Sequence, residues 1–243
     1  MSIRARFVLV AVVAAALTSA RPAQASNIIL NGGFETFLNN WTLVDQAGGS
    51  GGWFQQAGNI SPLNGFAVGV PPQGSFAAMT DQGGPGSHVL YQDFVVPVGV
   101  SSAILEFQHY IGNTAGAFST PSSLDFTVSP NQQARVDIIT TTANVFSVAG
   151  GDVLLNLFQT QVGDSLVQPY ALLSTNLTAF LQAHQGETLR LRFAEVDNQF
   201  FFSAGVDSVQ VSGGGALAQV PLRSARIPAN ALHRPAHLYK RIF

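Results

Sequence analysis

Three histidines in the central part of the chain are the first candidates for acid–base or metal chemistry. His88, His109 and His184 lie too far apart in the sequence to match a local metal signature such as His-x-x-x-His. His109 shares its side of an alternating segment with Leu105 and Phe107. This pattern favours a hydrogen-bonded histidine in the core or at its rim over a metal ligand.

Catalysis by a serine nucleophile or by two carboxylates has little support in the sequence. Gly48–Gly52 contains the letters Gly-x-Ser-x-Gly, but that motif requires a strand-to-helix turn, and here a glycine-rich loop has no helix after it. Glu106, Glu195 and Asp197 could form a glycosidase pair, but no spacing sets the distance between them. A non-catalytic protein is therefore predicted, with a glycan-active hydrolase as an alternative.

A sugar-binding surface needs an aromatic platform that stacks on a ring and planar polar groups that bind its hydroxyls. The candidate platforms are Trp53, Tyr91 and Tyr110, and the candidate polar partners are Gln92, Gln108 and Arg192. These residues predict binding of polysaccharide or matrix glycans.

A series of short strands must position these residues. Ser101–Ile111 and Glu187–Val196 alternate apolar and polar residues with a period of two, and their polar positions suggest a sheet with one solvated surface. The expected strands are Trp53–Ala57, Phe76–Thr80, Val89–Val96, Ser101–Ile111, Leu124–Val128, Ala134–Thr140, Val153–Phe158, Tyr170–Ser174, Glu187–Val196 and Val206–Val211. Only Leu177–Ala183 is expected to be helical. Without a βαβ rhythm, this order predicts an all-β fold, an antiparallel β-sandwich or jelly roll.

The two ends of the chain differ from this core. Residues 1–25 combine Arg4 and Arg6, an apolar run and Ala23-Gln24-Ala25, which is typical of a cleaved signal peptide. The apolar run is shorter than the ~20 residues that a membrane span requires. Residues 26–212 are the predicted β-sandwich domain, and 213–243 are a glycine linker, beginning at Gly213–Gly215, with a basic tail that is expected to be disordered.

Charge and cysteine content exclude several kinds of partner and site. All 13 acidic residues lie between Glu35 and Asp207, and only three basic residues, Arg135, Arg190 and Arg192, accompany them there. An acidic domain argues against nucleic-acid binding. The chain has no cysteine, so disulfides, zinc–thiolate sites and cysteine nucleophiles are excluded.

Both ends of the predicted domain resemble the galactose-binding-like β-sandwich family, which includes many carbohydrate-binding modules. Asn27–Glu35, followed by Trp41-Thr42, is similar to the opening strand and turn of that fold, and Gly205–Val211 is similar to its last strand. The resemblance implies that Trp41 packs in the core. It also implies a structural calcium site with Glu35 and Asp207 as carboxylate ligands and backbone carbonyl groups near Gly33. The alternative is that Glu35 accepts backbone N–H bonds and Asp207 pairs with an arginine.

The signal, the acidic Gly- and Phe-rich domain and Val220-Pro221 are also similar to exported PEP-CTERM proteins of Gram-negative bacteria. The chain departs from that pattern because Leu222-Arg223 stands where Glu-Pro is expected, and no apolar span precedes the final basic residues. Secretion to the periplasm or the exterior is therefore predicted, without a transmembrane anchor. The oligomeric state is left open.

Three functions remain from the sequence. The first is an exported, non-catalytic β-sandwich that binds glycans. The second is a structural surface or matrix component that acts through protein–protein contacts, for which Phe200-Phe201-Phe202 could supply an exposed surface or pack under a loop. The third is the glycan-active hydrolase.

Overall fold

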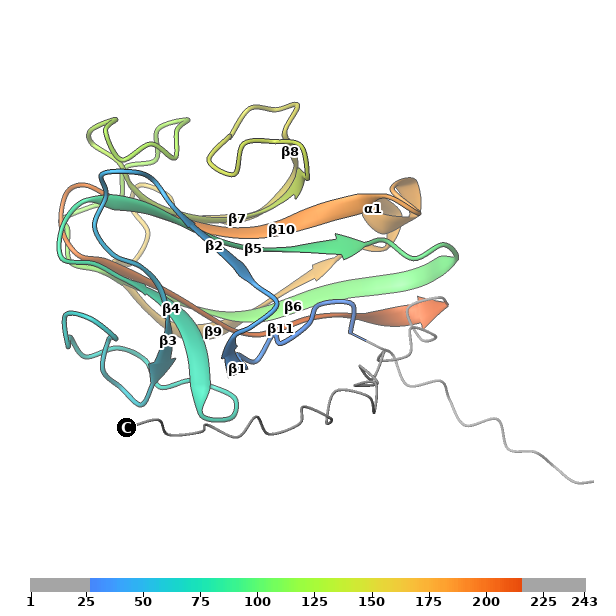
Figure 1. Cartoon of the computed structure of the whole chain (residues 1–243), viewed down its shortest axis with the longest axis horizontal. Coiled ribbons are helices and arrows are strands. Elements are labelled where there is room, and N and C mark those ends of the chain that lie inside the picture. Colours follow the sequence, from blue (N-terminus) through green and yellow to red (C-terminus); the bar gives the residue numbers. More distant parts are fainter. Residues whose placement is uncertain (1–26, 216–243) are drawn as a thin grey trace, which may run out of the picture.

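Alternating apolar residues build two stacked antiparallel sheets, as seen in a computed structural model that describes residues 27–215 (Figure 1). The upper sheet in the figure has the order β2-β5-β10-β7-β8, and the lower sheet has the order β3-β4-β11-β6-β9. The elements are β1 (Glu35–Leu38), β2 (Thr42–Asp45), β3 (Gly52–Ala57), β4 (Phe76–Asp81), β5 (Gly86–Val95), β6 (Val100–Asn113), β7 (Gln132–Thr140), β8 (Val153–Gln159), β9 (Val167–Asn176), α1 (Thr178–Ala183), β10 (Thr188–Asp197) and β11 (Phe202–Gly215). The predicted β-sandwich is confirmed.

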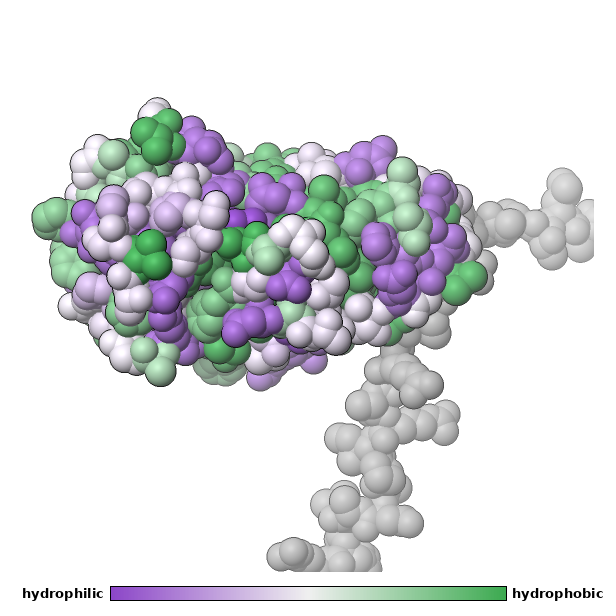
Figure 2. All heavy atoms as spheres, turned by 90° about the horizontal axis from the view of Figure 1, so that it is seen from above, coloured by the Kyte–Doolittle hydropathy of each residue, from purple (hydrophilic) through white to green (hydrophobic). Residues whose placement is uncertain are grey.

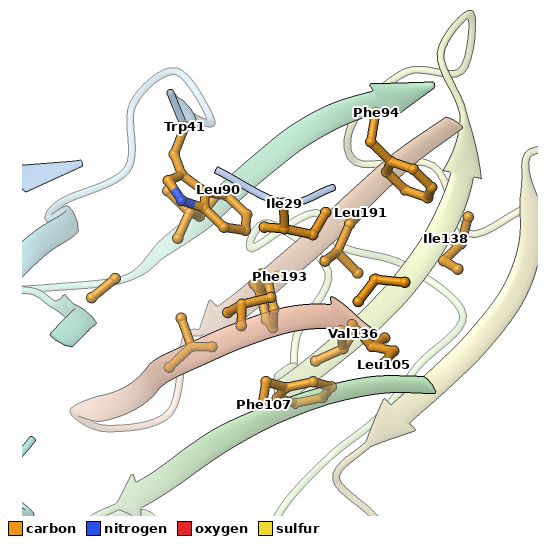
Figure 3. Close-up of a cluster of buried hydrophobic side chains, with 14 of the residues drawn as sticks. Ile29, Trp41, Leu90, Phe94, Leu105, Phe107, Val136, Ile138, Leu191 and Phe193 are labelled. Atoms are coloured by element: carbon orange, nitrogen blue, oxygen red, sulfur yellow. The ribbon is translucent and has the colours of Figure 1, made fainter. Parts of the chain in front are cut away.

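The core lies between the two sheets, where every second residue of the central strands points inward (Figure 3). Leu191 and Phe193 of β10 face Leu105 and Phe107 of β6 across the sandwich. Phe107 and Phe193 meet edge to face, with ring centroids 5.4 Å apart. Trp41 is 6% exposed and packs on Phe193 with centroids 5.8 Å apart, so its predicted core position is confirmed.

The amino-terminal segment is held against the last strand. Val209 donates its backbone N–H to the Gly32 carbonyl at 2.9 Å, and Val211 donates to Asn27 Oδ1 at 2.9 Å. A Cβ on Gly32 would lie 1.9 Å from the Val209 carbonyl oxygen, so glycine permits this close approach. The two ends of the described domain therefore meet at β11.

Most of the predicted strands are present, and they are often longer than the alternation indicated. β6 covers Ser101–Ile111, β10 covers nearly all of Glu187–Val196, and α1 matches the one predicted helix. β11 continues to Gly215, so the prediction of a linker at Gly213–Gly215 is wrong: their backbone pairs with β6. The predicted signal and basic tail lie outside the described residues. Within residues 27–215, no helix is long and apolar enough to cross a membrane.

The predicted strand at Leu124–Val128 is wrong, because local hydrogen bonds hold this segment in turns. Val128 donates to the Asp125 carbonyl at 3.1 Å, and Asp125 donates to Ser123 Oγ at 3.0 Å. Asn131 Nδ2 binds the carbonyl oxygens of Ser123 and Asp125. Hydrogen bonds with Ser, Asp and Asn side chains thus take the place of the backbone hydrogen bonds that a strand would make with a neighbouring strand.

Candidate functional site

Two loops cover part of the outer face of the upper sheet. They are residues 114–131, between β6 and β7, and residues 141–152, between β7 and β8, and they stand above the sheet in Figure 1. A second apolar cluster holds them down: Leu124, Phe126, Val145, Phe146 and Val148 pack on Val89, Ala194 and Val196 of the sheet. Figure 2 views this side of the molecule and shows hydrophilic and hydrophobic residues interspersed on its surface. The loops are therefore supported by a core of their own.

An open hollow of about 480 Å³ lies between these loops. Its lining combines one aromatic ring with amide, carboxylate and hydroxyl groups: Gln46, Ser123, Asp125, Asn144, Phe146 and Ser147. We call it the loop hollow. Its volume falls within the ~300–1,000 Å³ that small-molecule sites occupy. The site therefore has the size and the mixed polarity that a small polar ligand requires.

Asp125 is fixed by its neighbours in the loop hollow. Gln46 Nε2 donates to Asp125 Oδ1 at 2.6 Å, and Thr127 donates to the same oxygen from its backbone N–H and its hydroxyl, each at 2.8 Å. These hydrogen bonds, led by the one from Gln46, lower the pKa of Asp125. The carboxylate is thus charged at neutral pH, and the bonds to Oδ1 leave Oδ2 to meet a ligand.

The opposite wall is ordered by its own turn and by Arg192. The Phe146 N–H donates to Asn144 Oδ1 at 2.9 Å, which leaves the Asn144 amide nitrogen to donate elsewhere. Arg192 Nη1 donates to the carbonyl oxygens of Val145 and Ser147, each at 2.7 Å. Phe146 is partly exposed. Arg192 therefore positions the wall of the loop hollow from beneath.

A buried ion network anchors Arg192. Asp137 accepts hydrogen bonds from Arg135 Nε and Nη2 and from Asn156 Nδ2, at 2.7–2.8 Å, and also from Arg192 Nη2. Both Asp137 and Arg192 are 0% exposed. Burial alone would raise the pKa of Asp137, but the two guanidinium groups outweigh it and lower the pKa. The carboxylate therefore stays charged and holds both arginines.

The six residues predicted to bind glycan are not brought together. Three of them belong to the upper sheet. Tyr91 stacks against Arg190, whose Cζ lies 3.9 Å from the ring centroid, and Arg192 is buried. Gln92 is also buried and accepts a hydrogen bond from the Leu30 N–H at 2.7 Å. The others belong to the lower sheet.

On the lower sheet, Trp53 of β3 is 4% exposed and belongs to the main core. Tyr110 of β6 is 6% exposed and packs on Tyr170 with ring centroids 5.5 Å apart, while Gln108 is partly exposed on the same strand. A shared groove lined by Trp53, Tyr91 and Tyr110 is therefore absent from residues 27–215. Alternation alone could not tell which of the two sheets carries each strand.

The predicted calcium ligands do converge. Gly33 lies beside Asp207, since a Cβ on Gly33 would be 4.0 Å from Asp207 Oδ1. The backbone N–H of Gln73 donates to Asp207 Oδ2 at 3.0 Å, and Ser75 and Phe76 donate to Glu35 Oε1. Glu35 thus accepts backbone N–H bonds, as the alternative expected.

No arginine pairs with Asp207 among the described residues; backbone N–H groups bind it instead. Burial, and then the charge of Glu35, raise the pKa of Asp207 to about 6. Two interacting carboxylates form an all-oxygen donor set of the kind that calcium prefers. A cation here would relieve their repulsion, so the residues fit the ion.

The three carboxylates considered for hydrolysis do not form an accessible pair. Glu195 and Asp197 are buried on the core side of the upper sheet, 0% and 3% exposed. Glu106 lies on the lower sheet and accepts hydrogen bonds from Gln210 and Ser174. A substrate could not contact Glu106 together with either of the others.

Sequence reasoning missed all six residues of the loop hollow. Asp125 lies in the segment Leu124–Val128 that was expected to be a strand, and the other five lie outside the expected strands. Their one local sign is the density of Ser, Asp and Asn in turns, such as Ser122-Ser123-Leu124-Asp125. That composition predicts loops, and it carries no information on which loops face each other.

The comparisons with known proteins concern the fold. No family model matches the sequence, and no curated protein matches it. The chain is similar to the TmCBM61 structure in complex with β-1,4-galactotriose (TM-score 0.46, 11% identity, 77% of this chain and 99% of that chain). It is also similar to the stig cyclase Fisc from Fischerella sp. TAU (TM-score 0.45, 15% identity, 79% and 98%). A third similar structure is CBM28, a carbohydrate-binding module specific for non-crystalline cellulose (TM-score 0.41, 12% identity, 79% and 98%).

Proposed function

We propose that this protein is an exported, non-catalytic β-sandwich that binds glycans in the loop hollow. The observation that carries the proposal is the lining of that hollow, where Phe146 lies among Gln46, Asp125 and Asn144 in a volume of about 480 Å³. A sugar ring presents an apolar face and a rim of hydroxyls, and this lining offers a partner for each.

The polar groups of the loop hollow match the hydroxyl rim of a sugar. Asp125 Oδ2 can accept from a hydroxyl, and the Asn144 amide nitrogen can donate to one. Because Gln46, Thr127 and Arg192 already fix the geometry of these groups, little side-chain freedom is lost when a ligand binds. The site is preorganised for a polyhydroxylated ligand.

Charge narrows the class of glycan. Among the six lining residues, Asp125 alone carries a charge, and it is negative. A uronic acid or sulfate group would be repelled by this carboxylate without a compensating base in the lining. The preferred ligand is therefore a neutral glycan.

The exported location and the calcium ion are separate parts of the proposal. Export rests on the sequence of residues 1–25, which resembles a cleaved signal. Calcium rests on the convergence of Glu35 and Asp207, with carbonyl groups near Gly33 as further ligands. The ion would tie the start of the domain to β11.

The experiment that tests glycan binding uses the mature protein on a panel of immobilised neutral and acidic polysaccharides. We expect retention on at least one neutral glycan and none on the acidic ones. An Asn144→Ala variant should lose retention, whereas Gln108→Ala, on the other sheet, should keep it. Equal retention of both variants would exclude the loop hollow as the binding site.

The structural alternative has one observation in its favour. Phe200 is 66% exposed, and Phe201 packs edge to face on Phe66 with centroids 5.4 Å apart, while Phe202 is in the core. Such an exposed aromatic group could mediate protein–protein contacts. Sedimentation would measure self-association. If the parent self-associates, Phe200→Ser does not, and no glycan binds, the structural function is favoured.

A further inference from the structure

A second group of polar side chains lies inside the sandwich, on the core side of the upper sheet. His88 of β5 and Glu195 of β10 face each other in the strand register, and Asp197 follows two residues later on the same side. One ligand atom from each of the three lies within 4.8 Å of the others. Two donors on one ion with bonds of ~2.1 Å lie at most about 4.2 Å apart, so small side-chain movements would bring the three donors around a single ion.

Three of the four carboxylate oxygens of this cluster lack hydrogen-bond partners. Both oxygens of Glu195 and Oδ1 of Asp197 are buried and have no donor among residues 27–215. Glu195 is 0% exposed. A buried carboxylate without a partner is costly, because it loses its hydration and gains nothing in return. The cluster therefore requires a cation or protons.

His88 is oriented as a metal-binding histidine is. Its Nδ1 lies 2.7 Å from Asp45 Oδ1, so the ring donates from Nδ1 to a carboxylate. In the neutral ring, this bond leaves the lone pair on Nε2. Nε2 lies 3.1 Å from the Ser50 carbonyl oxygen. Because a ring nitrogen with a lone pair and a carbonyl oxygen are both acceptors, either a cation or a second ring proton must lie between them.

Protonation alone does not satisfy the cluster. A fully protonated His88 has one N–H left after Asp45, and it would be used by Ser50. A proton shared between Glu195 and Asp197 Oδ1 would pair two of the three unpartnered carboxylate oxygens and would leave one oxygen of Glu195 without a donor.

The surrounding residues close the site and add donors. A Cβ on Gly86 would lie 2.4 Å from His88 Nε2 and 2.7 Å from the Ser50 oxygen, so glycine keeps this space open. Gln82 adjoins Asp197, and its side-chain oxygen has no hydrogen-bond partner among the described residues. The amide oxygen of Gln82 and the carbonyl of Ser50 are available as further ligands.

We propose that His88, Glu195 and Asp197 bind one divalent first-row transition-metal ion, such as Zn²⁺ or Mn²⁺, inside the sandwich. An imidazole together with carboxylate and carbonyl oxygens suits these ions, whereas the all-oxygen pair Glu35/Asp207 suits calcium. Because the site is buried and shares no residue with the lining of the loop hollow, its role is structural. It does not depend on glycan binding.

The test compares metal binding by the parent protein with that of Glu195→Gln and of the matched control Glu106→Gln. Each protein is unfolded in urea with chelator, dialysed, and refolded without metal, with ZnCl₂ or with MnCl₂, so that burial cannot block entry. We expect one equivalent of metal per parent chain by elemental analysis. At a free metal concentration of about 100 Kd, the melting temperature should rise by about 5–10 °C.

Glu195→Gln separates a metal ligand from a merely structural residue. It should melt at or above the temperature of the metal-free parent, because it removes a buried unpaired carboxylate, and it should lose the metal-dependent rise. Glu106→Gln should keep that rise. The proposal is overturned if the parent binds neither ion, or if Glu195→Gln binds it with the parent's stoichiometry and affinity.

Discussion

At the scale of residues, buried charge is used to hold backbone in place. Asp137 binds Arg135 and Arg192, and Arg192 in turn binds the backbone of residues 145–147 beneath the loop hollow. Asp93 and Arg190 form a comparable bidentate pair, but the Asp93 side chain is 38% exposed. Comparing the two pairs therefore separates the effect of burial on stability from the effect of ion pairing.

Replacing Asp137 by Asn should lower the free energy of unfolding by about 3–5 kcal/mol, because it leaves buried Arg192 without its counter-charge. Asp93→Asn should cost less than about 1 kcal/mol, since an exposed pair contributes little. Urea denaturation of both variants measures the difference. Similar costs for the two would show that Arg192 does not depend on Asp137.

His109 should make stability depend on pH. Its ring packs edge to face on Phe158 at 4.2 Å and lines a small cavity of about 20 Å³, whose lining includes one charged residue, Arg135. Burial lowers the pKa of His109, so below about pH 6.5 the unfolded chain binds a proton that the folded chain does not. Stability is thus lost as the pH falls through that value.

His109→Phe should remove this part of the pH dependence. The parent should lose more stability than the variant between pH 7 and pH 5, as measured by urea denaturation at each pH. Parallel curves for the two proteins would mean that His109 titrates equally in the folded and unfolded chains.

Single residues were only partly predictable from the sequence. The core position of Trp41 and the convergence of Glu35 with Asp207 were expected from the chain's resemblance to a fold. The burial of Trp53 and Arg192 was not. Alternation does not show which side of β3 faces the core, and it does not show which loop covers the outer side of β10.

At the scale of elements, the contact between the first segment and β11 can be tested with adjacent glycines. Gly32→Ala should lower the free energy of unfolding by about 1–3 kcal/mol, because its Cβ would collide with the Val209 carbonyl. Gly33→Ala should change it by less than about 0.5 kcal/mol, since its Cβ would meet only Asp207 Oδ1 at 4.0 Å. Equal effects would contradict the close approach of Gly32 to β11.

Long alternating strands were the most predictable elements. Ser101–Ile111 and Glu187–Val196 pair with neighbours on both sides, so their period of two reflects one face in the core. β1 and β2 have four residues each and were missed, since so short a segment shows no period. Leu124–Val128 has strand-like residues, but its apolar side chains cover the upper sheet.

At the scale of the whole molecule, calcium should stabilise the fold by joining its two ends. Adding Ca²⁺ to chelator-treated protein should raise the melting temperature by about 5–10 °C at about 100 Kd. Asp207→Asn should abolish this rise, and Glu195→Gln should keep it. If calcium leaves the melting temperature of the parent unchanged, Glu35 and Asp207 do not form a stabilising calcium site.

Isothermal titration tests most directly whether the loop hollow binds a neutral glycan. The ligand is a neutral oligosaccharide derived from a polysaccharide that retains the protein. Phe146→Ala should weaken binding by about tenfold or more, because the loss of ~1.4 kcal/mol of stacking corresponds to that factor. Asp125→Asn should weaken it by about 10- to 100-fold through loss of a charge-assisted hydrogen bond. Gln108→Ala should bind as the parent does. Unchanged affinity in both Phe146→Ala and Asp125→Asn would contradict the claim.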